Sequence, residues 1–538
     1  MVFTKRFDIM AEKTSWRTPP QAIDEALITN TYEADVAIIG FGYSGLAAFR
    51  TLAEAGKKVI AAESMPREKW WTYGHDFAHI NSKWQKEHGF PEVDVVEFVN
   101  NFQVQTQNKA NAYFTMQFAR HSGETFDWFI QPVSEDILNR GRFAFYPENE
   151  YTIHRLNNGF RYYGGTMQWW EDWQNGIGMR NNGEGMELKN LSWANRDYME
   201  ANFPNAQVLY DTQACQLLKE EGKVMGFVAK QGDEYIRVLA KDGVILAGGG
   251  FGANNEMCKD LLPHIARTFA SDEKFLGIMD RNGSAIQMGV WAGGRIETDI
   301  GSMNFDSSVI PDYIPGPLWV NEEGCRFQNE GFAGPELNGF YHARSSRGKM
   351  ISVYDSTYDS QILRGFPGHQ AFDYSDAHSV ETMMENFAEA RAQKGTPTRK
   401  GFVCADSVEE LADAMGLTAE AKDNFLNTIA RYNELCKQGV DEDYGKDPRF
   451  MNAIAEGPFY AHITEPKLGF ALCTVGAFVT TNKQQVVDAN YKPIPGLYAC
   501  GNCCGRRFGT AYITPMPGMS IGMAVTLGRE LGKYLAEK

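Results

Sequence analysis

The sequence ADVAIIGFGYSGLAAFRTLAEAGKKVIAAE, residues 34–63, has the pattern of a strand, a turn, a helix and a second strand. Residues 34–40 form a short apolar run rich in β-branched side chains, which is typical of a buried parallel strand. Residues 44–56 repeat Ala and Leu at helical spacing and end in a glycine, a suitable C-cap. Residues 58–62 predict the second strand, and Glu63 follows it. The segment therefore predicts one βαβ unit.

The turn of this unit is a GxGxxG motif made by Gly40, Gly42 and Gly45. Gly40 permits the tight turn, Gly42 lets the backbone approach a pyrophosphate, and Gly45 lets the helix pack on the strand. The helix N-terminus then offers free N–H groups and a favourable dipole to the anion. An acid at Glu63 can accept hydrogen bonds from a ribose, which favours FAD or NAD over a 2′-phosphorylated cofactor.

The bulk composition describes a globular chain of two or three domains. It has 538 residues, of which 43% are hydrophobic and 22% charged, and its formal net charge is -16. An acidic surface argues against a nucleic-acid partner, and no apolar run reaches the roughly 18 residues that a membrane span requires. The N-terminal residues have no apolar core and do not resemble a secretory signal. We therefore expect a cytoplasmic location. The alternative that a leader was removed from the sequence given stays open.

Nine cysteines in a chain of this length do not form a disulfide framework and suggest a reducing compartment. Cys500-x-x-Cys503, followed by Cys504, has the spacing of a redox motif. It lies in a strand-to-loop segment near the C-terminus, without the helical unit of a thioredoxin-like fold. There is also no second Cys or His pair at zinc spacing, so we expect neither a redox pair nor a metal site.

The rest of the chain divides into four parts by pattern. We expect an irregular N-terminal arm over 1–33, the first part of a nucleotide-binding domain over 34–304, an inserted domain over 305–462, and the second nucleotide-binding part over 463–538. Helices are expected over 94–122, 408–415, 419–436 and 520–535, short strands over 208–244, 477–481 and 496–500, and a loop-rich stretch over 162–193.

Two further glycine-rich segments follow expected strands. Residues 247–250, Ala-Gly-Gly-Gly, end a buried strand, where they either line a ligand crevice at a topological switch point or allow tight strand packing. Residues 496–502 and 517–522 lead into the last helix, which begins near Met519. Its N-terminus could stabilise the N1/C2=O edge of a reduced flavin, or the helix could simply pack against the core.

Several motifs in a fixed order resemble the fumarate reductase/3-ketosteroid dehydrogenase flavoprotein superfamily, over residues from about 34 to 535. After GxGxxG and Glu63 come GVILAGGGFGAN (243–254), GCRFQNE (324–330), GPFYA (457–461), IPGLYACGN (494–502) and PGMSIGMAVTLGREL (517–531). The resemblance implies an α/β fold: a Rossmann-like FAD-binding domain in two sequence segments, with an inserted α+β capping domain and the active site at their interface.

The resemblance also implies the FAD contacts, residue by residue. The pyrophosphate is assigned to Gly40, Gly42, Ser44 and Gly45, the adenosine to Glu63, Ser64, Ala214, Ala247 and Gly248, the ribityl chain to Gly501 and Asn502, and the ring edge to Met519, Ser520 and Ile521. Asn502 stands where the family usually has Glu. Residues 74–81 replace the family's Ser/Thr-rich loop beside flavin N5 and depart from its pattern, so His75 and Asp76 are weaker assignments. His75 and His79 are alternatively core histidines.

The dicarboxylate clamp of fumarate reductases is missing from this sequence. The family's Asn-Arg-Leu-Gly-Gly corresponds to residues 514–518, Thr-Pro-Met-Pro-Gly, and its His-Thr step to Cys473-Thr474. The proton-donating Arg of the capping domain falls near Gly334. Because a dianion needs charge-assisted hydrogen bonds, fumarate and succinate are disfavoured. The Pro-x-Pro-Gly pattern is closer to the ketosteroid dehydrogenase branch.

Candidates for proton transfer lie in both domains. Tyr512 is the first candidate for the proton donor, with the N–H of Gly518 supporting the substrate carbonyl oxygen; the alternative is a core tyrosine. In the capping domain Tyr341 and Arg344 lie in the sequence FYHARSSR, which otherwise reads as a solvated basic turn. Arg326 is expected to be structural and to pair with an acid such as Glu330.

Together these features predict an FAD-dependent oxidoreductase that acts on CH–CH or C=C groups. We expect hydride transfer from flavin N5, plus proton donation, to the activated C=C of an apolar or aromatic substrate such as a steroid-like enone or a phenylpropenoid. Electrons would come from a small reductant or a donor protein, since there is no second dinucleotide motif. Two alternatives stay open: a 3-ketosteroid-type dehydrogenase that introduces a C=C next to a ketone, and a non-catalytic flavin electron-carrier subunit.

Overall fold

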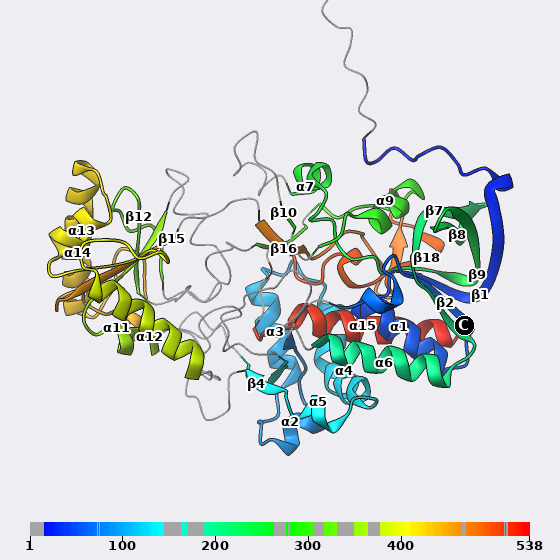
Figure 1. Ribbon diagram of the computed structural model, residues 1–538, viewed down its shortest axis with the longest axis horizontal. Helices are drawn as coiled ribbons and strands as arrows, with labels where there is room; N and C mark the ends of the chain where they lie inside the picture. Colours follow the sequence, from blue (N-terminus) through cyan, green and yellow to red (C-terminus); the bar gives the residue numbers. More distant parts are fainter. Residues whose placement is uncertain are drawn as a thin grey trace, which may run out of the picture.

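The computed structural model describes residues 15–72, 74, 76–144, 163–169, 188–262, 276–277, 280–298, 300–304, 317–330, 349–363, 377–464, 470–510, 512 and 515–538. These residues form a larger α/β domain and a smaller α+β domain, which lie at opposite ends of the molecule (Figure 1). The smaller domain is drawn in yellow-green to light orange and comes from the middle of the chain. None of the helices in the described residues is both long and apolar enough to cross a membrane.

The larger domain is built on an eight-stranded sheet with the order β17-β18-β9-β1-β2-β6, in which β7 and β8 extend from β9. β1 is parallel to β2 and β9, β6 is parallel to β2, and β18 is parallel to β9, whereas β7, β8 and β17 are antiparallel to their neighbours. The strands are β1 (Ile28–Ile39), β2 (Val59–Ala62), β6 (Ala206–Leu209), β7 (Thr212–Glu220), β8 (Lys223–Gln231), β9 (Glu234–Leu246), β17 (Gln485–Val487) and β18 (Pro493–Ala499).

The alternation of side chains along β1 gives this sheet two buried faces. Val36 and Ile38 join a core with Leu46 and Phe49 of α1 (Tyr43–Glu54) and with Val525 of α15 (Met519–Ala536). Ala37 and Ile39 point to the other face and join a core with side chains of β8, β9 and α9 (Ser284–Trp291). Because both faces of the sheet are covered, the end of β1 is a continuous run of apolar residues, and apolar and polar residues do not alternate there.

Most of the other helices of the larger domain pack around α1 and α15. They are α2 (Lys83–Glu87), α3 (Val95–Gln105), α4 (Ala112–Ile130), α5 (Glu135–Leu138) and α6 (Leu188–Asn202), with 3₁₀ turns at Glu25–Leu27, Arg67–Lys69 and Gly501–Cys503. α7 (Asn255–Leu261) instead joins the core on the other face of the sheet, with α9. Two three-stranded sheets complete the domain: β3 (Asp76–Phe77), β5 (Thr166–Gln168) and β4 (Arg142–Ala144), and β10 (Leu276–Gly277), β16 (Phe470–Thr474) and β11 (Ser302–Asn304).

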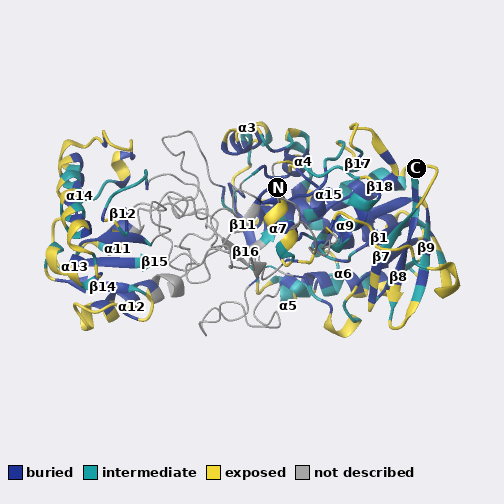
Figure 2. Ribbon diagram, turned by 90° about the horizontal axis from the view of Figure 1, so that it is seen from above, coloured by how far each residue is buried: buried dark blue, intermediate teal, exposed yellow. Residues whose placement is uncertain are grey.

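The smaller domain is a four-stranded antiparallel sheet of order β12-β13-β15-β14 with helices on both faces. Residues of α13 and α14 join Val353 and Ala461 in one core, whereas Phe387 of α12 joins Tyr354 and Tyr460 in another. Figure 2 shows the buried sheet between partly exposed helices. The elements are β12 (Leu318–Asn321), β13 (Met350–Tyr354), α11 (Tyr358–Leu363), α12 (Ala377–Ala392), β14 (Phe402–Ala405), α13 (Val408–Ala414), α14 (Ala419–Gln438), a 3₁₀ turn at Pro448–Phe450 and β15 (Phe459–Thr464).

The structure confirms the predicted βαβ unit, the strands of 208–244 and the helices near 408–415, 419–436 and 520–535. Three predictions were wrong in detail. Residues 1–33 are not wholly an irregular arm, because β1 begins at Ile28 and pairs with β9 from there. Residues 477–481 do not form a strand; Phe478 and Thr480 make isolated bridges only. The boundary at 462 falls inside β15, which pairs with β13 as far as Thr464.

Candidate cofactor and active site

The start of α1 is open in the way that a bound phosphate requires. Gly40 has φ +96°, and a Cβ on it would lie 2.6 Å from the carbonyl oxygen of Ala247. A Cβ on Gly45 would lie 2.2 Å from the carbonyl oxygen of Gly40. At Gly42, in contrast, a Cβ would meet nothing within 4 Å, and no side chain caps this N-terminus. The first and third glycines therefore serve packing, and the middle one borders free space over the helix N-terminus, where a pyrophosphate fits.

Glu63 follows β2 and is placed beside the same turn. One oxygen of its carboxylate accepts from the N–H of Phe41 at 3.0 Å, and the other accepts from the N–H of Met65 at 2.9 Å and from Ser64 Oγ at 3.3 Å. The side chain is buried, at 8% exposure. A carboxylate has about four lone-pair directions, so these contacts orient it and leave room for a ribose hydroxyl. Ala214 is buried in β7, two residues after Thr212, whose N–H donates to the Glu63 carbonyl oxygen.

Two further glycines make close contacts with helices, Gly501 with α1 and Gly248 with α9. A Cβ on Gly501 would lie 2.4 Å from Ser44 Oγ, and one on Gly248 would lie 2.6 Å from the Cβ of Ala285. The strands that carry them are adjacent, since the N–H of Cys500 donates to the carbonyl oxygen of Leu246. The segments that contain Gly248 and Gly501, both of which were assigned to FAD, are therefore neighbours in space.

The start of α15 faces the loop that precedes β3. Gly518, its N-cap, has φ +74°, and a Cβ there would lie 2.7 Å from the backbone of Asp76. A Cβ on Gly74 would lie 2.3 Å from Cδ1 of Ile521. The N–H of Ala78 donates to the carbonyl oxygen of Gly518 at 3.3 Å. Asp76, Gly518 and Ile521 thus come together in space. They are the residues predicted for flavin N5, for the substrate carbonyl oxygen and for the N1/C2=O edge, respectively.

Tyr512 reaches the same helix start. Its hydroxyl oxygen accepts a hydrogen bond of 3.1 Å from the N–H of Ser520, in the first turn of α15. The side chain is only 2% exposed and packs against Phe508 at a ring-centroid distance of 4.8 Å. Around it lies an apolar cluster that includes Phe98, Phe118, Met516, Met519 and Met523. The phenol is therefore a polar group with apolar neighbours at the N-terminus of α15.

Not every assigned residue can be placed. His75, Tyr341 and Arg344 lie outside the residues that the structure describes, as do Gly334 and Thr514. His79 is fully buried and stacks on Phe126 at 3.7 Å between ring centroids, and neither ring nitrogen has a described partner. Burial lowers the pKa of His79 to about 3, so the ring is neutral. This favours the core interpretation of His79 over a role in the site.

A buried contact between Asp280 and Thr474 could not be foreseen from the sequence. Oδ2 of Asp280 accepts from the N–H of Gly252 at 2.7 Å, the N–H of Thr474 at 2.7 Å and Thr474 Oγ1 at 2.8 Å. Thr474 Oγ1 in turn accepts from the N–H of Phe251 at 2.9 Å. Burial raises the pKa of Asp280 above its usual value, although these hydrogen bonds act to lower it. Thr474 therefore holds the second glycine segment to β16 and is not free to bind a substrate carboxylate.

Arg507 is the second residue that sequence reasoning missed. Its side chain is fully buried, and it donates to Oδ1 of Asn502 and, at 3.4 Å, to the carbonyl oxygen of Ser520. The available signal was the pair Arg506-Arg507 in a segment, 495–528, that is otherwise free of charged side chains. A cation in such a segment is either exposed, as Arg506 is, or buried because it interacts with a partner.

The nine cysteines are all free. Burial raises the pKa of Cys500 to about 12 and that of Cys504 to about 11, so these thiols stay protonated near neutral pH. This is the opposite of an activated redox thiol. Among the described residues, His121, Glu124 and Glu530 are close enough together to share a metal ion, but Glu124 already pairs with Arg529 and Lys533.

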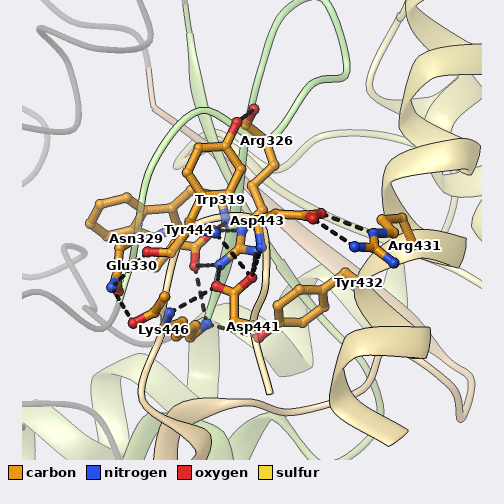
Figure 3. A network of polar contacts seen from close by, with 11 residues as sticks. Trp319, Arg326, Asn329, Glu330, Arg431, Tyr432, Asp441, Asp443, Tyr444 and Lys446 are labelled. Atoms are coloured by element: carbon orange, nitrogen blue, oxygen red, sulfur yellow. Dashed lines mark hydrogen bonds and ion pairs between the residues drawn. The ribbon is translucent and has the colours of Figure 1, made fainter. Parts of the chain in front are cut away.

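Arg326 in the smaller domain pairs with Glu330, as predicted. The guanidinium lies between two buried carboxylates, with Nε 2.8 Å from Glu330 and Nη2 2.7 Å from Asp441 (Figure 3). The ammonium of Lys446 is 3.3 Å from Glu330 and also donates to the hydroxyl of Tyr432 at 2.8 Å. Two cations and two carboxylates balance one another, so this network is structural.

The open start of α1, the acid after β2 and the second helix start at Gly518 define a dinucleotide-binding flavoprotein. Residues 35–521 match the family model described as FAD binding domain, so the chain belongs to this family. The cofactor is FAD, and the prediction of the fumarate reductase/3-ketosteroid dehydrogenase superfamily is confirmed. The predicted α/β fold class is confirmed as well.

Three relatives illustrate the range of similarity. The chain is 32% identical to a vinyl phenol reductase of Lactiplantibacillus plantarum over 225 residues, which cover 41% of this chain and 43% of that protein. It is 24% identical to a urocanate reductase of Eggerthella lenta, over 93% of this chain and 74% of that protein. It is 29% identical to a 3-oxosteroid 1-dehydrogenase of Mycolicibacterium smegmatis, over 61% and 58%. The chain thus spans about half or less of the length of the first curated relatives that it matches.

Among solved structures, a 3-ketosteroid Δ4-(5α)-dehydrogenase from Rhodococcus jostii aligns with a TM-score of 0.66. The alignment covers 96% of this chain and 99% of that one at 21% identity. A 3-ketosteroid Δ1-dehydrogenase from Sterolibacterium denitrificans aligns with a TM-score of 0.62 at 16% identity, over 95% and 100%. At these identities the likeness establishes the fold alone.

Proposed function

We propose that this protein is an FAD-dependent oxidoreductase that reduces the activated C=C of a mostly apolar substrate that is not a dicarboxylate. Bound FAD would supply the hydride from N5 of its ring. The observation that carries the proposal is the position of Tyr512, whose buried hydroxyl lies at the first turn of α15 beside Gly518. Steroid-like enones and phenylpropenoids have the required chemistry.

The proton is the chain's own contribution to such a reaction. Hydride addition to an activated alkene leaves a carbanion or enolate, which needs a proton donor and support for the oxygen. Tyr512 accepts the N–H of Ser520, which fixes its hydroxyl at the first turn of α15. We assign the proton donation to Tyr512 and the support of the carbonyl oxygen to the N–H of Gly518. Tyr341 and Arg344 would add contacts from the smaller domain.

The surroundings of Tyr512 favour an uncharged substrate. The phenol is embedded among phenylalanine and methionine side chains, which solvate a hydrocarbon well and an anion poorly. Thr474, at the position of the family's clamp, is held by Asp280 and Phe251. Relatives are named for vinyl phenols, acrylate, urocanate and oxosteroids, so the family as a whole acts on diverse substrates.

The substrate class can be tested by reoxidation. The FAD-loaded protein is reduced without oxygen and mixed with a vinyl phenol, a phenylpropenoid, a steroid enone, acrylate, urocanate or fumarate, while the visible absorbance of the flavin is followed. We expect fast reoxidation by at least one of the first three. Reoxidation by fumarate or urocanate alone would contradict the proposed substrate class, and failure of every compound would favour an electron-carrier subunit.

The role of Tyr512 can be tested by removing its hydroxyl. Tyr512→Phe should lower the rate of reoxidation by ~100-fold or more, because the positioned acid is lost while the ring and its packing are kept. Tyr491→Phe is the matched control, since Tyr491 is 63% exposed and remote from this cluster. An unchanged rate in Tyr512→Phe would remove this residue from the mechanism.

The reverse reaction is a second candidate, because the same pair of groups can serve a dehydrogenase. A relative that is 29% identical over 61% of the chain is named 3-oxosteroid 1-dehydrogenase. In that direction Tyr512 would take part in activating the ketone, and oxidised FAD would be bleached by a saturated 3-oxosteroid. Bleaching by that ketone, with no reoxidation by the alkenes, would favour the dehydrogenase.

A further inference from the structure

Arg507 is a buried cation without an acidic partner. Its side chain has 0% exposure, yet no described carboxylate forms an ion pair with it. Its terminal nitrogens donate to two neutral oxygens, Oδ1 of Asn502 and the carbonyl oxygen of Ser520. Its Nε has no hydrogen-bond partner. Among the residues that the structure describes, the charge is therefore solvated only by neutral groups.

The other deeply buried arginines of the described chain are treated differently. Arg50, at 1% exposure, pairs with Glu54 at 2.8 Å and donates to three further oxygens. Arg326 is held by the carboxylates of Glu330 and Asp441. Removing a charge from water costs several kcal/mol unless an opposite charge and full hydrogen bonding compensate for it. Arg50 and Arg326 have this compensation from described carboxylates, whereas none of the described residues supplies it to Arg507.

The titratable groups around Arg507 do not supply a negative charge. Its electrostatic neighbours are Cys473, Cys500, Cys504 and Tyr512, three thiols and a phenol. Burial raises the pKa of Cys500 and Cys504 above neutrality, and burial also lowers the pKa of Arg507 itself. Within the described residues the positive charge at this position is thus uncompensated, which points to an anion that arrives with a ligand.

The two anchors of Arg507 show where that anion would lie. Asn502 follows β18 and is a neutral amide, so it brings no negative charge to this position. Ser520 is in the first turn of α15, where the helix dipole already favours a negative charge. The pyrophosphate is expected at the start of α1 instead, over Gly42. The start of α15, to which Ser520 belongs, would hold the N1/C2=O edge of the ring, which becomes negative on reduction.

We propose that the guanidinium of Arg507 compensates the negative charge that FAD gains at its N1/C2=O edge on reduction. It acts together with the N-terminus of α15, and it makes the bound cofactor a better electron acceptor. The proposal rests on the ring edge lying at the start of α15. It does not depend on the identity of the substrate or on Tyr512 as the proton donor.

The two-electron midpoint potential of bound FAD tests this proposal without any substrate. Arg507→Gln should bind reduced FAD at least tenfold more weakly relative to oxidised FAD, which corresponds to a midpoint potential lower by about 30 mV or more. Arg507→Lys keeps the charge and should lie close to the wild type. Arg506→Gln is the matched control, because Arg506 is the exposed neighbour in sequence. Affinities for oxidised and reduced FAD are measured in parallel, so a weakly binding variant still gives the ratio.

The stability of the FAD-free protein separates this role from a structural one. Removing an uncompensated buried charge should leave the apo protein as stable as the wild type, or more stable. A lowered midpoint potential together with undiminished apo stability would support the proposal. Equal losses of affinity for oxidised and reduced FAD would overturn it and assign Arg507 to the pyrophosphate. An unchanged potential with a destabilised apo protein would overturn it in favour of a purely structural arginine.

Discussion

Gly518 combines a left-handed backbone with a neighbour that leaves no room for a side chain. Its φ is +74°, and a Cβ would lie 2.7 Å from the backbone of Asp76. The first property costs a non-glycine residue about 1 kcal/mol, and the second forces two backbone segments apart. These segments carry the residues that we assign to flavin N5 and to the ring edge, so a change at Gly518 should weaken FAD binding.

We predict that Gly518→Ala retains several-fold less FAD than the wild type and unfolds at a lower temperature. The matched control is Gly416→Ala, at the end of α13. Gly416 has nearly the same φ, +72°, but a Cβ there would meet nothing within 4 Å. The control therefore carries the backbone cost without the clash. Equal FAD content in the two purified variants would show that the contact with Asp76 is unimportant.

Individual residues also show what sequence patterns can and cannot predict. Gly40, Gly45 and Glu63 were identified because a short motif specifies local backbone geometry and one following strand. Arg507 and Asp280 were not, since their partners lie in other segments: Asp280 bonds Gly252 and Thr474. A polar residue buried by tertiary contacts has no local pattern of its own, so the fold must be known first.

At the scale of elements, the smaller domain depends on a charged network that joins β12, the following loop and the segment after α14. Arg326, Glu330, Asp441 and Lys446 have side chains that are at most 6% exposed (Figure 3). Burial raises the pKa of Asp441, but hydrogen bonds from Arg326 and the N–H of Lys446 outweigh it and lower the pKa to about 2. The ionised form is therefore favoured in the folded domain.

Asp441→Asn should destabilise the smaller domain by roughly 3 kcal/mol or more, because it leaves two buried cations with one carboxylate. In the wild type the contribution of Asp441 is present above pH 4 or so and is lost as the pH falls toward its folded pKa of about 2. Denaturant unfolding at neutral pH measures the first effect. Asp443→Asn is the control, since Asp443 pairs with the exposed Arg431 and should cost less than about 1 kcal/mol.

Helices and strands were predictable to the extent that their periodicity was local. α15 was placed within a residue of its observed start, and α14 began where its pattern did. The first half of β1 was missed, because Ile28–Glu33 is exposed or half-exposed and has no apolar run. Its pairing with Tyr235–Leu239 of β9 supplies the hydrogen bonds that keep it extended. Long-range pairing of this kind has no signature in the segment itself.

For the molecule as a whole, stability should depend on pH through His79. Burial lowers its pKa from 6.5 to about 3, so between these values the unfolded chain binds one proton more than the folded one. The free energy of unfolding therefore falls by about 1.4 kcal/mol for each unit of pH below 6.5. Stability lost in this range is regained when the pH rises.

His79→Phe should remove this dependence and preserve the stack on Phe126. Between neutral pH and pH 5 the variant should lose about 2 kcal/mol less stability than the wild type, measured by urea unfolding at both values. His88→Phe is the control, because it removes an exposed histidine that lies outside this buried stack. An identical pH slope in wild type and His79→Phe would show that the ring is protonated in the folded protein.

The connectivity of the central sheet has a consequence for how the protein is made. β18 lies directly beside β9 in the sheet and leads to Gly501. In the sequence, however, β9 ends at residue 246 and β18 begins only at residue 493. During translation, β1, β2 and β9 leave the ribosome long before their last parallel neighbour and α15. The smaller domain, whose strands all lie between Leu318 and Thr464, can fold first. The cofactor site is thus completed only after β18 and α15 have been synthesised, and FAD would bind once these elements have folded onto the sheet.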